Sequence, residues 1–510
     1  MDRVSSYLVV FQVLFFILHV HLDHINGQSL YETPREDKLK DSEAHSYYRK
    51  VYERELFHEI RINNLHKELE MIRDTCTTPD LQSTSPSYQI PSQNITRGSK
   101  GKGFMLLFMK NIVNTTKHVY VTSESDVQMN ITTSSRLDPS LKMHIDRNSV
   151  VKSSHHIILP TEFDLNYFQK EVKSVLIETS DDVNVISFDS GHGTVGSTMN
   201  LPIHKLSTKY IVTSVTPYTG RKSQLAVVAI QNGTFISITF KMAENVVLNI
   251  QGDAFYNGSV FYLYLNSFET YQIAHASDLT GSVIESSYPI AAFSGNDCIK
   301  MDGIGYCDHL VAQLPPTDAV DDTYIVPPNS VGRDTVIRIT AIEKTEMYYV
   351  IGTVNKTISI DKTNFFDTRF FSKQTCLIKS TRPVLVTGIG LASKISNLGD
   401  PTMTIIQGIN QYLNYYKLVI PTGYINNFVS LMIKESSQDF IRINSSVVTA
   451  CNIVFEKNVL LGSNTYNVKS IRVPEGDLTA FTLNGEVFGI VVTGLNKDEA
   501  YGFSGNILLP

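Results

Sequence analysis

The residues best suited to chemistry lie in one short stretch, where Cys298 and Cys307 are followed by His309. Thiolate and imidazole groups are common zinc ligands. In an oxidising compartment, however, two cysteines this close in sequence usually pair with each other. We therefore predict a Cys298–Cys307 disulfide that closes a loop of about ten residues, and we predict no metal site.

Two other patterns are typical of binding sites. Residues 191–196 match the dinucleotide-binding pattern G-x-G-x-x-G, but residues 197–202 cannot begin the helix that such a site requires. A glycine-rich turn is the better interpretation. His155 and His156 are adjacent in an extended run, so their side chains should point to opposite faces and cannot share a metal ion without help from other residues.

Motifs of known catalytic machinery are absent from the sequence. It has no nucleophile elbow, zinc-protease helix, EF-hand loop or P-loop. We therefore expect no catalytic residues and no cofactor. An enzyme acting on glycans remains the least favoured alternative.

The elements that must position these residues belong to a globular chain. Of its 510 residues, 42% are hydrophobic and 18% are charged, and the net charge is -6. This composition excludes a disordered chain. The absence of basic blocks argues against nucleic acid as a partner, because phosphate binding requires clustered Lys and Arg.

The N-terminal segment is typical of a signal peptide over residues 1–27. Its apolar run, Tyr7–Val20, is uncharged and shorter than the ~20 residues that span a membrane, and no later stretch is long enough. A short buried helix or a signal anchor is the alternative. We expect a secreted, soluble chain, and seven N-glycosylation sequons agree with export: Asn94, Asn114, Asn130, Asn232, Asn257, Asn355 and Asn444.

Residues 28–76 form the next region, whose charged part over 41–74 has apolar residues at alternating steps of three and four. This spacing predicts an amphipathic helix. A coiled coil that makes a homo-oligomer is one hypothesis, and a helix packed against its own domain is the other. Residues 77–102 are rich in Ser, Thr and Pro, which is typical of a linker.

From residue 103 onward, short runs of Val, Ile, Phe, Tyr and Thr alternate with polar turns, which predicts an all-β region over 103–510. Asn232-Gly233 lies between two such runs and predicts a tight hairpin. A strand ending at Gly, followed by a Tyr before an apolar run, recurs about every 100 residues. We predict four β-sandwich-like repeats, with a β-propeller as the alternative; their approximate bounds are 103–218, 219–330, 331–423 and 424–510.

The remaining three cysteines are assigned by elimination. Cys376 and Cys451 both follow Thr-rich strand segments, and we predict that they form a disulfide. Cys76 would then lack a partner in its own chain. An intermolecular Cys76 disulfide between neighbouring helices is one interpretation, and a monomer with a capped or buried thiol is the other.

One group of motifs resembles a known family. Phe293–Cys298 reads FSGNDC, Cys307–Pro316 reads CDHLVAQLPP and Thr323–Pro328 reads TYIVPP. These segments resemble the N-terminal domain of the IgG-Fc-binding protein family, and the resemblance covers most of 103–509. It implies an extracellular, non-enzymatic module of mucus-type and adhesive proteins.

Members of that family often carry von Willebrand type D or EGF-like modules, for which this sequence shows no counterpart. We expect a secreted recognition or adhesion protein whose partner is an extracellular protein or glycan, such as a mucus or microbial surface component. A structural component of mucus or matrix is the alternative. The resemblance does not identify an antibody-binding site in these residues.

Overall fold

The computed structural model describes residues 98–301, 307–329, 332–393 and 398–509. Every described residue belongs to one unit of the chain, residues 83–510. The predicted signal peptide, the predicted helix with Cys76, most of the linker and Asn94 lie outside the described residues. In the part of the chain that is described, no helix is long and apolar enough to cross a membrane.

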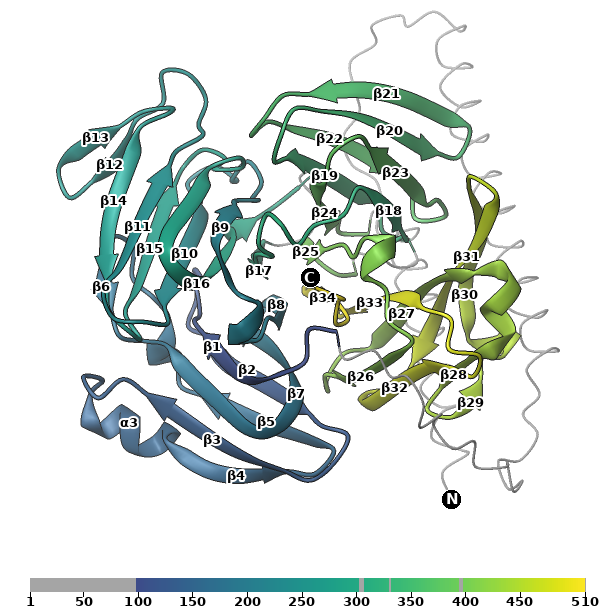
Figure 1. The fold of residues 1–510 in the computed structure, drawn as a ribbon, viewed down its shortest axis with the longest axis horizontal. Coiled ribbons are helices and arrows are strands. Elements are labelled where there is room, and N and C mark those ends of the chain that lie inside the picture. The colour runs from purple at the N-terminus through teal and green to yellow at the C-terminus, as the bar shows by residue number, and fades with distance from the viewer. Residues whose placement is uncertain (1–97, 302–306, 330–331, 394–397, 510) are drawn as a thin grey trace, which may run out of the picture. The chain divides into compact units, whose positions relative to one another are not determined.

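The fold is mainly β, as predicted, and its strands form four consecutive sets (Figure 1). The first set contains β1 (Gly101–Leu106), β2 (Thr116–Thr122), β3 (Val127–Thr133), α3 (Pro139–Ile145), β4 (Arg147–Val151), β5 (Ser154–Leu159), β6 (Lys170–Glu171), β7 (Val175–Gly191) and β8 (Thr194–Asn200). The second contains β9 (Ser207–Ile211), β10 (Ser223–Ala229), β11 (Thr234–Thr239), β12 (Leu248–Ile250), β13 (Asp253–Phe255), β14 (Val260–Leu265), β15 (Thr270–His275), β16 (Val283–Ile299) and β17 (Asp308–Gln313).

The third and fourth sets continue in the same way. The third contains β18 (Thr323–Val326), β19 (Thr335–Ala341), β20 (Thr345–Ile351), β21 (Val354–Ile360), β22 (Phe365–Phe370), β23 (Cys376–Ser380), β24 (Val384–Gly390) and β25 (Thr402–Ile405). The fourth contains β26 (Tyr415–Ile420), β27 (Asn426–Lys434), β28 (Ile441–Ile443), β29 (Ser446–Val447), β30 (Ile453–Leu461), β31 (Asn464–Val473), β32 (Gly476–Thr482), β33 (Phe488–Leu495) and β34 (Ala500–Ser504).

Apolar cores form between the sheets, and some of them continue from one set into the next: the core of the third set includes Met432 and Val468 of the fourth. In the third set, the sheets β18-β23-β20-β21 and β22-β19-β24-β25 are separate and share a core that includes Ile325, Ile337 and Ile378. In the first two sets, a single strand of 17 residues, β7 or β16, pairs with one group of strands along its first half and with another along its second half. The first half of β16 pairs with β9 and β11, and its second half pairs with β10 and β17.

Proline marks the point where this crossing strand changes partners. Pro289 lies inside β16, where the pairing with β9 shifts register between Glu285 and Ile290. Pro383 lies between β23 and β24 and separates them. Because proline has no backbone N–H to donate, it fits where a ladder is interrupted.

A buried tyrosine near the start of three sets fastens this crossing point. The hydroxyl groups of Tyr210, Tyr324 and Tyr416 donate to the carbonyl groups of Ile290, Val384 and Phe488 at 2.7, 2.6 and 2.6 Å. Each hydroxyl also accepts from the backbone amide three residues earlier. Each tyrosine therefore ties the beginning of its set to the strand at the crossing point. The repeat bounds given above rest on the sequence and remain a prediction.

The Asn232-Gly233 segment forms a turn, in which Gly233 has a φ of +74°. The flanking strands do not pair with each other, because β10 pairs with β15 and β16 while β11 pairs with β14 and β16. The predicted hairpin is therefore wrong. The crossing strand β16 separates the partners that the local signal would have joined.

The last strand of each set is called a return strand: β8, β17, β25 and β34. Each return strand contacts at least two of the other three. β8 lies against β17 and β34, and β25 lies against the same two strands, so the four form a closed circuit of contacts (Figure 1). Ser197 of β8 and Gly502 of β34 exchange hydrogen bonds at 3.0 and 3.2 Å. The return strands thus join the four sets.

Candidate functional site

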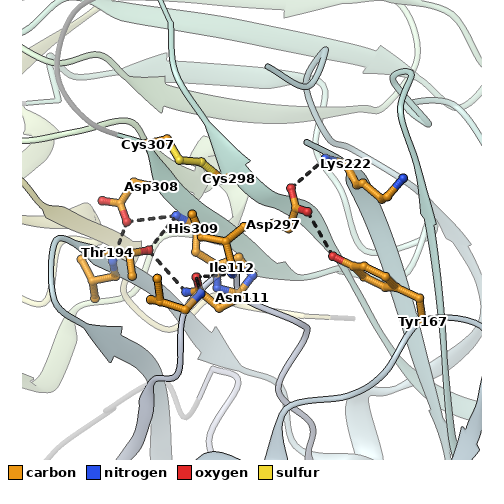
Figure 2. The surroundings of a disulfide bond; sticks show 12 residues. Asn111, Ile112, Tyr167, Thr194, Lys222, Asp297, Cys298, Cys307, Asp308 and His309 are labelled. Atoms are coloured by element: carbon orange, nitrogen blue, oxygen red, sulfur yellow. Dashed lines mark hydrogen bonds between the residues drawn. A yellow bond between two sulfur atoms is a disulfide. The ribbon is translucent and has the colours of Figure 1, made fainter. Parts of the chain in front are cut away.

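The disulfide predicted from sequence forms at the end of β16. Cys298 and Cys307 are bonded, with their Cα atoms 5.3 Å apart, and Figure 2 shows the bond beside Asp308 and His309. Both sulfur atoms are consumed, so they do not act as zinc ligands. Among the described residues, no group of three or more His, Cys, Asp or Glu is placed to hold a metal ion.

Asp308, the first residue of β17, links three strand sets. Its carboxylate accepts from the amides of Val195 at 2.5 Å, His309 at 2.9 Å and Ala500 at 3.2 Å. Burial, together with the neighbouring Asp400, raises the pKa of Asp308 well above its usual value. Sequence reasoning missed this residue, although it is the variable position of the C-x-H-L motif.

His309 is buried with polar contacts on both ring nitrogens. Its Nε2 lies 3.1 Å from Nε2 of Gln224, an amide donor, so Nε2 accepts in this contact. Nδ1 lies 2.8 Å from Asp189 Oδ2, a short contact that is poorly aligned for a hydrogen bond. The ring therefore packs between the first two sets.

Asp189 also contacts a buried cation. Lys117 is fully buried and its ammonium lies 3.0 Å from Asp189 and 2.5 Å from Asp164. Burial alone would raise the pKa of Asp189, but Lys117 and His309 hold it below its usual value. Two carboxylates facing one buried ammonium form an ion cluster, which suits a structural role.

A second buried cation, Arg333, lies in the third set, as Lys117 lies in the first. It is fully buried, and it donates to the carbonyl of Leu391 at 2.6 Å, to Asn329 Oδ1 at 3.0 Å and to the carbonyl of Asp400. Burial lowers its pKa to about 10, opposed by Asp400 and Asp308. We call Lys117, Asp189, His309, Asp308 and Arg333 the central polar joint.

The central polar joint faces no substrate-sized space among the described residues. The space beside His309 has no room for a water molecule. A cavity of about 50 Å³ lies between the four return strands, lined by Met199, Gln313, Met403 and Phe503 among others. That volume holds a few waters. The residues of the central polar joint can therefore hold strand sets together, but no space beside them is large enough for a substrate.

The turns that lead into the return strands converge. Gly399 donates to the carbonyl of Asn496 at 2.7 Å, and Asp308 reaches both Val195 and Ala500. We call the described parts of these turns the turn face: residues 191–194, 300–301, 398–401 and 496–499. His192 and Lys497 are its exposed side chains.

Of the remaining predicted positions, residues 191–196 overlap the turn face, whereas His155 and His156 lie on β5. Residues 191–196 form a turn and the start of β8, with Gly193 at φ +68°, which supports a glycine-rich turn. His156 is exposed, and its ring stacks on Tyr120 at 4.4 Å and contacts His118. Burial lowers the pKa of both His118 and His156. Two imidazoles alone make no metal site.

The predicted Cys376–Cys451 disulfide is wrong. Cys376 is a free, buried thiol, and burial raises its pKa. Cys451 is disulfide-bonded, and its partner is none of the other described cysteines. The prediction that Cys76 lacks a partner in its own chain depended on a Cys376–Cys451 bond, and that bond is not formed. Cys76 itself lies outside the described residues.

Most described sequons are open to solvent, and their occupancy remains a prediction. The exposed asparagines are Asn114, Asn232, Asn257, Asn355 and Asn444, while Asn130 is half-buried in β3. Exposure is the first requirement for a carried glycan.

Sequence reasoning also missed a group of exposed rings on the second set. Phe235 on β11 and Tyr262 and Tyr264 on β14 are 48%, 63% and 54% exposed. The rings of Phe235 and Tyr262 stack with centroids 5.6 Å apart. We call these three residues the aromatic strip. Period-two alternation was the available signal for Tyr262 and Tyr264, which it places on one face of β14. The pairing of Phe235 with Tyr264 brings the third ring to that face.

Comparison with known proteins identifies the family. The model of the IgGFc binding protein family matches residues 196–494. The human IgGFc-binding protein is 31% identical over 155 residues, which is 30% of this chain and 3% of that protein. The chain thus spans a small part of that relative's length.

Solved structures add no argument about the fold. The major pilin of Streptococcus pyogenes gives a TM-score of 0.13 at 6% identity, over 79% of this chain and 98% of its own. A Ca²⁺-stabilised adhesin with which an Antarctic bacterium binds ice gives 0.11 at 8% identity, over 81% and 100%. The family model, in contrast, covers more than half of the chain and includes the return strands β17 and β25. This chain therefore belongs to the IgGFc-binding protein family.

Proposed function

We propose that this chain is a secreted, non-enzymatic recognition protein that binds an extracellular glycoprotein or glycan, such as a component of mucus or of a microbial surface. The observation that best supports the proposal is the turn face, where turns of all four strand sets converge around Asp308. Binding residues are often carried on loops that a rigid scaffold positions. Here the scaffold is fastened by the central polar joint.

The family name supplies one candidate partner. The human relative is named for binding the Fc part of immunoglobulin G, so Fc belongs in any panel of ligands. A structural role in mucus or matrix is the second candidate, since clustering of chains through residues 28–76 would serve a network as well as it would raise avidity.

A binding assay with a matched pair of variants tests the proposal. The secreted full chain is passed over immobilised mucin glycoproteins, Fc and fixed microbial cells. The turn-face variant His192→Asp/Lys497→Glu should weaken saturable binding at least tenfold. Lys344→Glu, at a side chain 74% exposed outside the turn face, should leave it unchanged. Both variants should keep the wild-type Tm.

Three outcomes would contradict the proposal. Equal binding by both variants would remove the turn face as the contact. Insoluble multimers with no saturable ligand would favour the structural role. Release of sugars from a polysaccharide at a rate proportional to the concentration of this protein would show that it is an enzyme.

A further inference from the structure

Two of the three rings of the aromatic strip, Tyr262 and Tyr264, lie on a strand at an open sheet edge. In the described sheet of the second set, which β6 of the first set joins through β15, the strand order is β14-β11-β16-β10-β15-β6, so β14 has an unpaired side. Its sequence, Val-Phe-Tyr-Leu-Tyr-Leu, contains no charge and no proline. An apolar edge of this kind invites pairing with another chain unless something covers it.

A sequon lies at the end of the strip. Asn232 occupies the exposed turn before β11, and Tyr264 reaches across to that turn, because a Cβ added to Gly233 would lie 3.3 Å from the Tyr264 hydroxyl. Tyr264 pairs with Phe235 in the ladder, and Phe235 stacks on Tyr262. The three rings thus lead away from the turn along one face.

The side chain of Asn232 is already oriented for attachment. Its Oδ1 accepts from the amide of Ser267 at 3.1 Å, and its Nδ2, the atom to which a glycan is joined, donates no hydrogen bond among the described residues. The same arrangement recurs at Asn257, whose Oδ1 accepts from the amide of Met242 at 3.1 Å just before β14. At Asn444, by contrast, Nδ2 donates to the carbonyl of Asp477.

We propose that Asn232 carries an N-linked glycan that folds back onto Phe235, Tyr262 and Tyr264 and covers the open edge of β14. The apolar faces of sugar rings present C–H groups, and aromatic rings gain by burying their exposed faces against such groups. A sugar tethered beside the rings has an effective concentration in the millimolar range, which a free oligosaccharide seldom reaches. The occupant is therefore this chain's own glycan.

The test is a thermal double-mutant cycle on the full chain secreted from cells that attach N-glycans. Peptide mapping should find Asn232 occupied. Treatment of the folded protein with a glycosidase that converts the asparagine to aspartate removes the sugar and keeps the Oδ acceptor. The treatment should lower the Tm by about 2–4 °C. In Phe235→Ser/Tyr262→Ser the same treatment should change the Tm by less than 1 °C, roughly the limit of additivity between uncoupled sites.

The control separates this effect from glycosylation in general. Asn114→Gln removes an exposed sequon in the loop before β2, away from the aromatic strip, and should leave the shift on glycosidase treatment unchanged. If the double variant does not fold, Tyr262→Ser alone should reduce the shift by about half, and sugar C–H resonances of a labelled glycan should lose their upfield ring-current shifts.

Four results would overturn the proposal. These are an empty Asn232, an equal Tm shift in wild type and ring variant, binding of added oligosaccharide by the strip while Asn232 is glycosylated, and a dimer through β14 in the glycosylated protein. None of them bears on ligand binding at the turn face.

Discussion

The central polar joint and the aromatic strip reverse the usual distribution of side chains. At the joint, Lys117 and Arg333 are fully buried, whereas in the strip Tyr262 is 63% exposed. Lysine and arginine are almost never fully buried unless they are paired, and large aromatic residues are usually covered. The buried cations and the exposed aromatic rings each lie in a small part of the molecule.

The two exceptions have different physical consequences. A buried charge is tolerated only where partners offset its desolvation, so the joint fixes one arrangement of the strand sets. An exposed ring costs no desolvation but leaves apolar area uncovered, so the strip calls for a covering group. Substitutions of the same type should therefore be severe at the joint and mild at the strip or the open surface.

The largest effect is expected for Lys117→Met. This change leaves Asp164 and Asp189 buried without their cation and should lower the free energy of unfolding by about 3–5 kcal/mol. Lys102→Met, at a side chain 57% exposed and 3.8 Å from Asp181, should cost less than about 0.5 kcal/mol. Urea denaturation at pH 7 measures both, and equal costs would contradict the comparison.

Arg338→Met should have the next largest effect, and this effect should depend on pH. Arg338 contacts Asp278 at 2.5 Å and Asp367 at 2.7 Å, which joins the second and third sets. We expect a loss of about 3 kcal/mol at pH 7. Arg382→Met, at a side chain 64% exposed, is the matched control.

The sign of the pH effect follows from Asp278. Burial alone would raise the pKa of Asp278, but Arg338 and Thr280 hold it below its usual value. Its ionised form therefore stabilises the fold above about pH 4, and this contribution is lost as the pH falls through the lowered pKa. The difference between wild type and Arg338→Met should shrink on acidification. A difference that grew instead would show that the pair does not act through Asp278.

Removing the disulfide should have an intermediate effect. Cys298→Ala/Cys307→Ala opens a short loop at the turn face and should cost about 2.5–3 kcal/mol. Cys376→Ala removes a buried thiol without opening a loop and should cost about 1 kcal/mol. Denaturation midpoints of the two variants give the comparison, which fails if Cys376→Ala is the more damaging.

The smallest effect compares two tyrosines directly. Tyr324→Phe leaves the amide of Asp321 and the carbonyl of Val384 without this hydroxyl and should cost about 1–2 kcal/mol. Tyr262→Phe in the aromatic strip should change stability by less than about 0.5 kcal/mol. Thermal scans of the two variants suffice, and a larger loss at Tyr262 would mean that its hydroxyl has a partner.

Several features were predictable because they depend on near neighbours. Alternation of apolar and polar residues identified strands such as β11, and two cysteines nine positions apart identified a disulfide. The Cys376–Cys451 pairing failed because elimination ignores where the thiols lie: Cys376 is buried in β23, whereas Cys451 is exposed in the short 3-10 helix Ala450–Asn452. The Asn232-Gly233 hairpin failed because the local turn signal says nothing about the strand that lies between β10 and β11.

The sequence by itself determined the β class, the recurring Tyr and Gly elements, the short disulfide and the family motif around Cys307. Only the tertiary structure decided that Asp308 bridges Val195 and Ala500, residues 113 and 192 positions away, and that Lys117 is buried between two carboxylates. Backbone propensity and side-chain alternation act over a few residues, so they can be read along the chain. Which distant groups offset a buried charge depends on how the return strands pack, and that packing is a property of the whole fold.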